Sequence, residues 1–167
     1  LHRDATDVAL VGPDVAPNGH VLACGFIAGF RGNWSLRLVK TSAPHDEYPL
    51  TETSYPMYGP RWSPDGRLIA CTGYRPGDNS WGLYVVEART GALARVDTGP
   101  GNSRSPAWSP DGKRLVFENN RTGEYKLYVM DLPRLRFTEE PKLVWAPPQP
   151  VVKFSFASDP GGDTLPD

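Results

Sequence analysis

Three histidines are the residues of this chain best suited to catalysis or metal binding, and they lie far apart in the sequence. They are His2, His20 and His45. The only histidine that stands directly beside carboxylates is His45, which precedes Asp46 and Glu47. A structural or catalytic zinc site needs three or four ligands gathered together, and these residues are dispersed instead. We therefore expect surface histidines, with no catalytic residue and no metal site formed by this chain.

Motifs for nucleophilic catalysis and phosphate binding do not occur in the sequence. It contains no Gly-x-Ser-x-Gly elbow of a serine hydrolase, no P-loop and no Gly-x-Gly-x-x-Gly fingerprint. Asp65 and Asp111 each precede a glycine in a tight-turn pattern, and we interpret them as turn-forming residues. No cofactor is expected. Whether the chain is part of an enzyme stays uncertain, although its own residues favour a protein that is not one.

A row of aromatic residues is the strongest candidate for ligand binding. Trp34, Trp81 and Tyr125 each stand two residues before the leucine of a recurring apolar segment. Such rings either pack between structural units or form a platform on which sugars or a partner's side chains stack. The preceding loops add polar residues that would extend a binding site. These are Arg31, Arg75, Asp78 and Asn79.

The elements that position these side chains belong to a unit that occurs three times. The pentapeptide Trp-Ser-Pro-Asp-Gly begins at Trp62 and again, 46 positions later, at Trp108. A third copy lies upstream, where an offset of 47 aligns Cys24 with Cys71 and Trp34 with Trp81 without a gap. This copy has lost the Trp-Ser pair. The units begin near residues 10, 58 and 104, and a period of this length is typical of stacked repeat architectures.

Each unit is predicted to form four short strands. An Asp-Gly or Asn-Gly hairpin turn follows the first strand, and short apolar runs separated by Gly, Asn and Pro supply the others. In the second unit we expect strands near 59–63, 67–73, 82–88 and 92–97, with counterparts in the other two units. Trp62 of the second unit and Trp108 of the third are expected to be substantially buried at matching places. Four-stranded sheets stacked face to face around an axis form a β-propeller. The predicted fold class is therefore all-β, a propeller segment of about three four-stranded blades that do not complete a ring.

The two cysteines fall at equivalent places in adjacent units. Equivalent strands of stacked sheets lie about 10 Å apart, beyond the roughly 7 Å between Cα atoms that a disulfide can bridge. We therefore expect Cys24 and Cys71 to be reduced and buried.

The repeat resembles a known family. The pattern Pro-x-Trp-Ser-Pro-Asp-Gly, followed by Leu-Tyr-Val, is similar to the WD-like repeat of TolB-type propellers, and residues 60–66 with 83–86 and 106–112 with 127–131 carry the match. The resemblance covers roughly residues 8–145. It implies a structural motif with no universal catalytic residue, and a location in the periplasm or outside the bacterial cell. Some propellers of this general type are pectate lyases whose metal site gathers several histidines, which this chain does not supply.

The domain organisation predicted from the repeats is a propeller segment over residues 1–148, with a short region after it. The blades are expected near 8–53, 58–100 and 104–145. Residues 149–167 are either the start of a further blade or the opening of a laminin-G-like, concanavalin-type jelly roll, and both alternatives stay open. Because propellers usually have four to eight blades, the ring is expected to be closed by a longer chain or a second copy. Apolar end faces are expected at Val21–Ala23 and at Leu127–Val129.

Composition limits the classes of partner. The net charge is −1 and no basic stripe occurs, so a nucleic-acid partner is not expected. No apolar run is long enough to span a membrane. The function favoured by the sequence is a binding or scaffolding propeller segment of a larger bacterial envelope or secreted protein, which recognises a protein or a glycan. The alternative is part of a propeller polysaccharide lyase or hydrolase, or the gating propeller of a serine peptidase.

Overall fold

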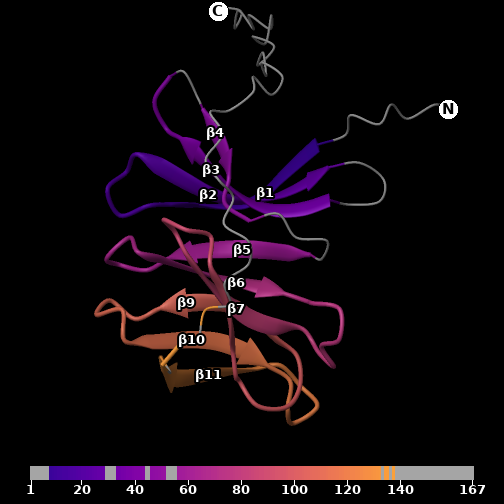
Figure 1. Cartoon of the computed structure of the whole chain (residues 1–167). Coiled ribbons are helices and arrows are strands. Elements are labelled where there is room, and N and C mark those ends of the chain that lie inside the picture. Colours follow the sequence, from indigo (N-terminus) through magenta and orange to yellow (C-terminus); the bar gives the residue numbers. More distant parts are fainter. Residues whose placement is uncertain are drawn as a thin grey trace, which may run out of the picture.

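The chain folds into three antiparallel sheets stacked one on the next (Figure 1). The structure, a computed structural model, describes residues 8–28, 33–43, 46–51, 56–132, 134, 135 and 137. These residues form eleven strands, so the all-β fold class is confirmed. Within this part of the chain, no helix is long and apolar enough to cross a membrane.

Each sheet corresponds to one repeat, and its strands follow one another in sequence order. Unit 1 contains β1 (Val8–Val15), β2 (Val21–Ala28), β3 (Asn33–Lys40) and β4 (Glu47–Pro49). Unit 2 contains β5 (Met57–Trp62), β6 (Leu68–Gly73), β7 (Gly82–Glu87) and β8 (Leu93–Val96). Unit 3 contains β9 (Ser103–Trp108), β10 (Arg114–Asn119) and β11 (Lys126–Asp131). The four strands expected in unit 2 are present. A fourth strand of unit 3 and the region 149–167 lie outside the described residues, so those expectations stay predictions.

The Ser-Pro-Asp-Gly segment builds the first hairpin of a unit through its own side chains. In unit 2, Ser63 donates its hydroxyl to Asp65 Oδ1 at 2.6 Å and accepts the Leu68 N–H at 2.9 Å. Asp65 Oδ1 also accepts the Arg67 N–H at 3.0 Å. Gly66 has a φ of 69°, a left-handed conformation that glycine adopts at little cost. Unit 3 repeats the same set of bonds, so the conserved spacing of the pentapeptide within this chain has a structural cause.

The first strand of each unit contains a β-bulge, and these strands contact one another along the stack. At the bulge stands a residue with positive φ followed by proline: Gly12 at 57°, Gly59 at 61° and Ser105 at 55°. Bulges bend a strand and free backbone groups for other partners. Two backbone N–H groups of these first strands bond between units. The Trp62 N–H donates to Asp14 Oδ2 at 2.7 Å, and the Ser105 N–H donates to Thr72 Oγ1 at 3.1 Å.

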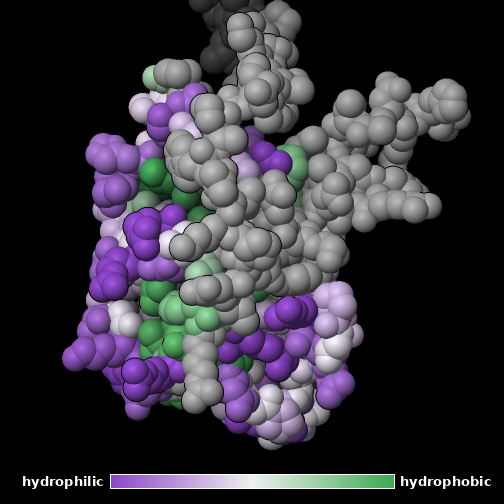
Figure 2. Space-filling view, in the orientation of Figure 1, coloured by the Kyte–Doolittle hydropathy of each residue, from purple (hydrophilic) through white to green (hydrophobic). Residues whose placement is uncertain are grey.

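Two hydrophobic cores lie between the sheets. Alternation along β6 and β7 sends one set of side chains toward unit 1 and the other toward unit 3. On the face that Figure 2 shows, hydrophobic residues gather over the second and third sheets, with hydrophilic residues on either side. The core between units 1 and 2 contains Ala23, Leu36, Leu50, Met57, Ile69, Cys71, Tyr84, Val86 and Leu93. The core between units 2 and 3 contains Ala70, Leu83, Val85, Val96, Leu115 and Phe117.

The repeat tryptophans occupy matching places but are only half-buried, less than the substantial burial expected. Both rings contact a core from its edge, Trp62 between units 1 and 2 and Trp108 between units 2 and 3. Trp108 Nε1 donates to the Arg61 carbonyl at 2.9 Å, whereas Trp62 Nε1 is buried without a hydrogen-bond partner. Each indole therefore lies at a boundary between sheets rather than inside one core.

Both cysteines are free and buried, as predicted. They lie in the second strands of their sheets, β2 and β6. Burial raises the pKa of the Cys24 thiol to about 11, with Glu47 adding to the shift and Arg37 opposing it. Burial alone raises the pKa of Cys71. These thiols therefore stay protonated at neutral pH.

Candidate functional site

Aromatic residues of unit 2 meet at one edge of its sheet. Tyr58 lies near the start of β5, Tyr74 directly follows β6, and Trp81 directly precedes β7. Because neighbouring strands are antiparallel, these three positions share an edge. The ring centroids of Tyr58 and Trp81 are 5.5 Å apart with planes at 62°, and those of Tyr74 and Trp81 are 5.5 Å apart with planes at 50°. Both are edge-to-face or tilted contacts of the kind that aromatic pairs prefer.

Unit 3 has a cation–π pair at the equivalent edge. Arg104 takes the repeat position of Tyr58, and Tyr125 takes that of Trp81. The Arg104 guanidinium carbon lies 3.8 Å from the Tyr125 ring centroid, and Arg104 Nε is 2.6 Å from Glu118 Oε2. We call Tyr58, Tyr74, Trp81, Arg104 and Tyr125 the rim cluster.

Residues of unit 3 influence the ionisation of a tyrosine of unit 2 within the rim cluster. Burial raises the pKa of the Tyr58 hydroxyl, while the nearby Arg104 charge opposes that rise and Tyr125 adds to it. The hydrogen bond to Glu118 raises the pKa of Arg104, which is charged at any physiological pH. Tyr74 and Tyr125 are exposed, whereas Tyr58 and Trp81 are half-buried. The rim cluster thus contains a charged guanidinium, two exposed tyrosine rings and a half-buried indole.

Two of the three aromatic positions predicted from the sequence fall in this cluster, Trp81 and Tyr125. The third, Trp34, lies in β3 with its backbone opposite Ile27, and its side chain lies outside the described part of the structure. Sequence analysis missed Tyr58, Tyr74 and Arg104. A signal for two of them existed, since Tyr58 and Arg104 each precede the positive-φ residue and proline of the bulge.

The predicted polar residues of the loop between β6 and β7 have different environments. Asp78 is mostly buried, and its carboxylate accepts the Tyr84 hydroxyl and the Arg75 N–H, the latter at 3.0 Å. Asp78 Oδ1 also lies 3.5 Å from Arg95 Nε. These bonds favour a role for Asp78 in holding the loop against its sheet. Arg75 and Asn79 have exposed side chains beside the rim cluster. Arg31 and His45 lie outside the described residues, as does His2, and His20 is exposed after its hairpin.

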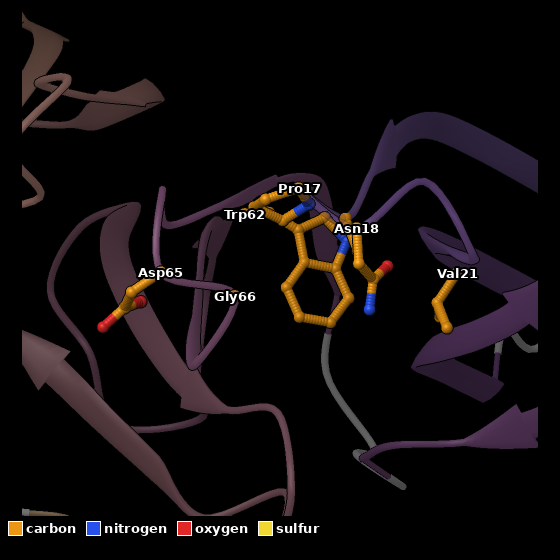
Figure 3. A pocket seen from close by; sticks show the side chains of 7 residues that line it. Pro17, Asn18, Val21, Trp62, Asp65 and Gly66 are labelled. Atoms are coloured by element: carbon orange, nitrogen blue, oxygen red, sulfur yellow. The ribbon is translucent and has the colours of Figure 1, made fainter.

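A shallow pocket of about 340 Å³ lies at the opposite edge, between the first hairpins of units 1 and 2 (Figure 3). Figure 3 shows the Trp62 ring beside Pro17 and Asn18, with the Asp65 carboxylate turned away from it. The polar oxygens of this pocket already serve their own turns, because Asn18 Oδ1 accepts the His20 N–H at 3.0 Å and Asp65 Oδ1 accepts bonds within its hairpin. Val15 stands where units 2 and 3 have tryptophan, so a smaller residue at the repeat position accompanies this hollow.

Metal chemistry finds no support in the part of the chain that the structure describes. Within it, no group of three His, Cys, Asp or Glu side chains lies close enough to hold an ion. The rim cluster gathers aromatic and cationic side chains of units 2 and 3 at one edge of the stack, which makes it the candidate site for ligand binding. Tyrosine, tryptophan and arginine at the end of a rigid sheet recognise a ligand by stacking and hydrogen bonding.

Comparison with known proteins agrees with the repeat and the fold. A family model described as the TolB β-propeller domain (PD40) matches residues 45–140. The Tol-Pal system protein TolB of Francisella tularensis is 36% identical over 85 residues, which are 50% of this chain and 19% of that protein. The chain thus spans about a fifth of the length of the curated relatives of this name that it matches.

Solved structures extend the likeness in fold. A TolB-type protein from Agrobacterium tumefaciens superposes with a TM-score of 0.63 at 25% identity, covering 72% of this chain and 42% of that chain. An oligogalacturonate lyase in complex with manganese gives 0.61 at 18% identity, covering 78% of this chain and 37% of its own. An acylaminoacyl peptidase from Pyrococcus horikoshii gives 0.58 at 17% identity, covering 80% of this chain and 24% of its own. The last two likenesses concern the propeller fold alone. The family match spans more than half of the chain, and the chain belongs to the TolB β-propeller domain family.

Proposed function

We propose that this chain is the binding and scaffolding part of a TolB-type propeller, and that it recognises a segment of another protein through the rim cluster. The observation that carries the proposal is the meeting of Tyr58, Tyr74 and Trp81 with the Arg104–Tyr125 pair at one edge of adjacent sheets. Tryptophan, tyrosine and arginine dominate the binding energy of protein interfaces, because they combine a large apolar area with hydrogen-bonding groups.

The scaffold supports the same proposal. Each rim residue lies at or beside the end of a strand that pairs with its neighbours in the sheet, so the strands position the rings before a ligand arrives. Pre-organised side chains lose less conformational entropy on binding. The Arg104–Glu118 ion pair adds a donor and an acceptor that a peptide backbone or a charged side chain can meet.

A protein ligand is favoured over a glycan by the orientation of the rings. Sugars stack on a flat, open ring face, but the Trp81 ring is only half-exposed and is contacted by Tyr58 and Tyr74. The relatives that match in sequence are named as members of the Tol-Pal system, a name that supports a role among proteins. The family resemblance also supports a location in the bacterial envelope, which cell fractionation of the native organism would test.

The experiment screens the whole chain against a displayed peptide library and, separately, a glycan array. Arg104→Gln and Tyr125→Ala change exposed side chains, so both variants are expected to keep their far-ultraviolet circular dichroism and lose the selected peptide. Arg114→Gln is the matched control, because Arg114 is an exposed arginine in unit 3 at the other end of β10. A selected peptide that binds Arg104→Gln and Tyr125→Ala as well as it binds the unchanged chain would exclude the rim cluster. Glycan hits without peptide hits would favour a carbohydrate ligand instead.

A further inference from the structure

The rim cluster holds several hydrogen-bond donors that the protein itself does not use. The indole N–H of Trp81 donates to no group of the described residues, and it is open to solvent. Arg104 donates through Nε to Glu118, but its two Nη atoms donate no hydrogen bond within the same part of the chain. Three phenol hydroxyls also form no hydrogen bond in the ranges described, those of Tyr58, Tyr74 and Tyr125.

The side-chain acceptors around the rim cluster, in contrast, mostly bond within the protein. Asn102 Oδ1 accepts the Trp81 backbone N–H at 2.9 Å, and Asn120 Oδ1 accepts the Asn102 N–H at 2.7 Å. The carboxylate of Asp78 bonds within its own loop and sheet, and that of Glu118 is paired with a guanidinium. A phenol hydroxyl can accept as well as donate, but indole and guanidinium N–H groups donate only. The rim cluster is therefore complementary to a ligand that is rich in acceptors.

Peptide backbones differ in the hydrogen-bonding groups that they offer to such a surface. A helix bonds its N–H and C=O groups internally, and an extended strand presents one donor and one acceptor for each residue. A polyproline II segment has no internal hydrogen bonds, and each proline in it contributes a carbonyl without an N–H. A proline-rich segment thus has an excess of acceptors, and segments of this kind dock against aromatic side chains.

The distance between units 2 and 3 matches one turn of a polyproline II segment. The Tyr58–Trp81 pair and the Arg104–Tyr125 pair lie at equivalent edges of sheets that stack about 10 Å apart. One turn of polyproline II has three residues and advances about 9 Å. Prolines at positions i and i+3 therefore lie on the same side of the segment and reach one pair each. Each pair also contains one group that only donates, an indole or a guanidinium.

We propose that the rim cluster binds a proline-rich segment of another protein in the polyproline II conformation. Prolines three residues apart pack on the two pairs, and the Trp81 indole and the Arg104 guanidinium donate to carbonyl oxygens of the segment. The inference rests on the proposed function, because it names the chemistry of the protein segment that the rim cluster recognises. A polyproline II segment is already ordered before binding, so it loses little conformational entropy on a rigid surface.

Trp81 differs in this respect from the other tryptophans whose side chains the structure describes. Trp62 Nε1 is buried without a partner, and Trp108 Nε1 donates to the Arg61 carbonyl at 2.9 Å. Neither indole is available to a ligand, although Trp62 lines the pocket at the opposite edge. The two residues therefore serve as internal controls for the donor role of Trp81.

The test follows the indole N–H signals of the full 167-residue chain by ¹⁵N NMR while a proline nonamer with blocked ends is added. The chain has five tryptophans, and Trp62→Phe, Trp81→Phe and Trp108→Phe each assign one signal by its loss. A nonamer of glycine and serine is the control peptide, because it has the same length without the polyproline II preference. Calorimetry gives the Kd for the unchanged chain and for variants whose far-ultraviolet circular dichroism is unaltered.

We expect the Trp81 signal to move with the proline nonamer, the Trp62 and Trp108 signals to stay, and the glycine–serine nonamer to move none of them. Trp81→Phe and Arg104→Gln are each expected to weaken binding about fivefold, because each removes a hydrogen-bond donor. Arg114→Gln, the exposed arginine at the other end of β10, is expected to leave the Kd unchanged.

A Trp81 signal that does not move would overturn the proposal, and this measurement needs no substitution to fold. A Kd that both Trp81→Phe and Arg104→Gln leave unchanged would overturn it as well. If the displayed library then still selects peptides that lack proline and need Arg104 and Tyr125, the proposed function stands and only the proline-rich ligand is excluded. If no selected peptide needs these two residues, the proposed function fails too.

Discussion

Ser105 is expected to be a site at which replacement by glycine stabilises the protein. Its φ of 55° is the only positive value among the non-glycine residues that the structure describes. The equivalent residues of units 1 and 2 are Gly12 and Gly59, with φ of 57° and 61°. The bulge therefore demands a left-handed residue in all three units, and only unit 3 meets that demand with a side chain.

The magnitude follows from two opposing effects. A left-handed conformation costs an L-amino acid about 1–2 kcal/mol, and Ser105→Gly removes that cost from the folded state. Glycine gives the unfolded chain more freedom, which returns about 0.5–1 kcal/mol. The Ser105 side chain is exposed, and the bond from its backbone N–H to Thr72 Oγ1 does not need the side chain. The net expectation is a gain of about 0.5–1 kcal/mol, or a rise in Tm of roughly 2 °C for a chain of this size.

Thermal unfolding followed by circular dichroism, with urea titration as a second measure, checks this value. Gly59→Ser is the matched control, because a Cβ at Gly59 would meet nothing within 4 Å and the substitution therefore tests backbone conformation alone. It is expected to lower stability by an amount similar to the gain from Ser105→Gly. If Ser105→Gly lowers Tm, or if both substitutions shift stability in the same direction, the bulge does not impose the conformation that we describe.

Three further predictions concern thiols, turns and the repeat tryptophans. Burial raises the pKa of Cys24 to about 11, so the contribution of its protonated thiol to the free energy of unfolding is complete below the ordinary pKa of 9.0 and is lost as pH rises through 11. Cys24→Ala should therefore flatten this part of the curve of stability against pH, which urea titrations at alkaline pH measure. Ser63→Ala should raise the pKa of Asp65, seen by NMR titration, because the Ser63 hydroxyl is the main group that holds that pKa below its usual range. Trp108→Phe should lower the free energy of unfolding, measured by urea titration, by about 1 kcal/mol more than Trp62→Phe does, because both remove the same ring volume but only Trp108 loses a hydrogen bond. Equal losses of unfolding free energy in the two variants would contradict this prediction.

The repeat predicted most of the fold because its signals act over short distances. The Ser63–Asp65 hydrogen bonds close a hairpin within a few residues, so the pentapeptide alone marks a strand, a turn and a second strand. A constant offset then located the other units. The equivalence of Cys24 and Cys71 correctly predicted two free thiols, because stacked sheets keep equivalent strands apart.

The candidate site was only partly predictable, because its contacts join strands that are not neighbours in sequence. The Tyr58–Trp81 contact connects the first and third strands of a sheet, and it depends on how far the two side chains reach along the sheet edge. Asp78 has the polarity of a binding residue, yet the Tyr84 hydroxyl and the Arg75 N–H occupy its carboxylate. The sequence shows that a carboxylate is present at this position, but it does not show which neighbouring groups already donate hydrogen bonds to it.

The spacing of the rim cluster limits the shape of its ligand. The Tyr58–Trp81 pair of unit 2 and the Arg104–Tyr125 pair of unit 3 lie at equivalent positions of neighbouring sheets, which stack about 10 Å apart. An extended segment in the polyproline II conformation has three residues per turn and rises about 3.1 Å per residue, so side chains three residues apart lie on the same face and would meet successive pairs. A helix advances about 1.5 Å per residue and would need a separation of about seven. Peptides selected by the rim cluster should therefore show paired preferences at either three or seven residues. The first result would indicate an extended segment lying across the sheet ends, and the second would indicate a helix laid along them.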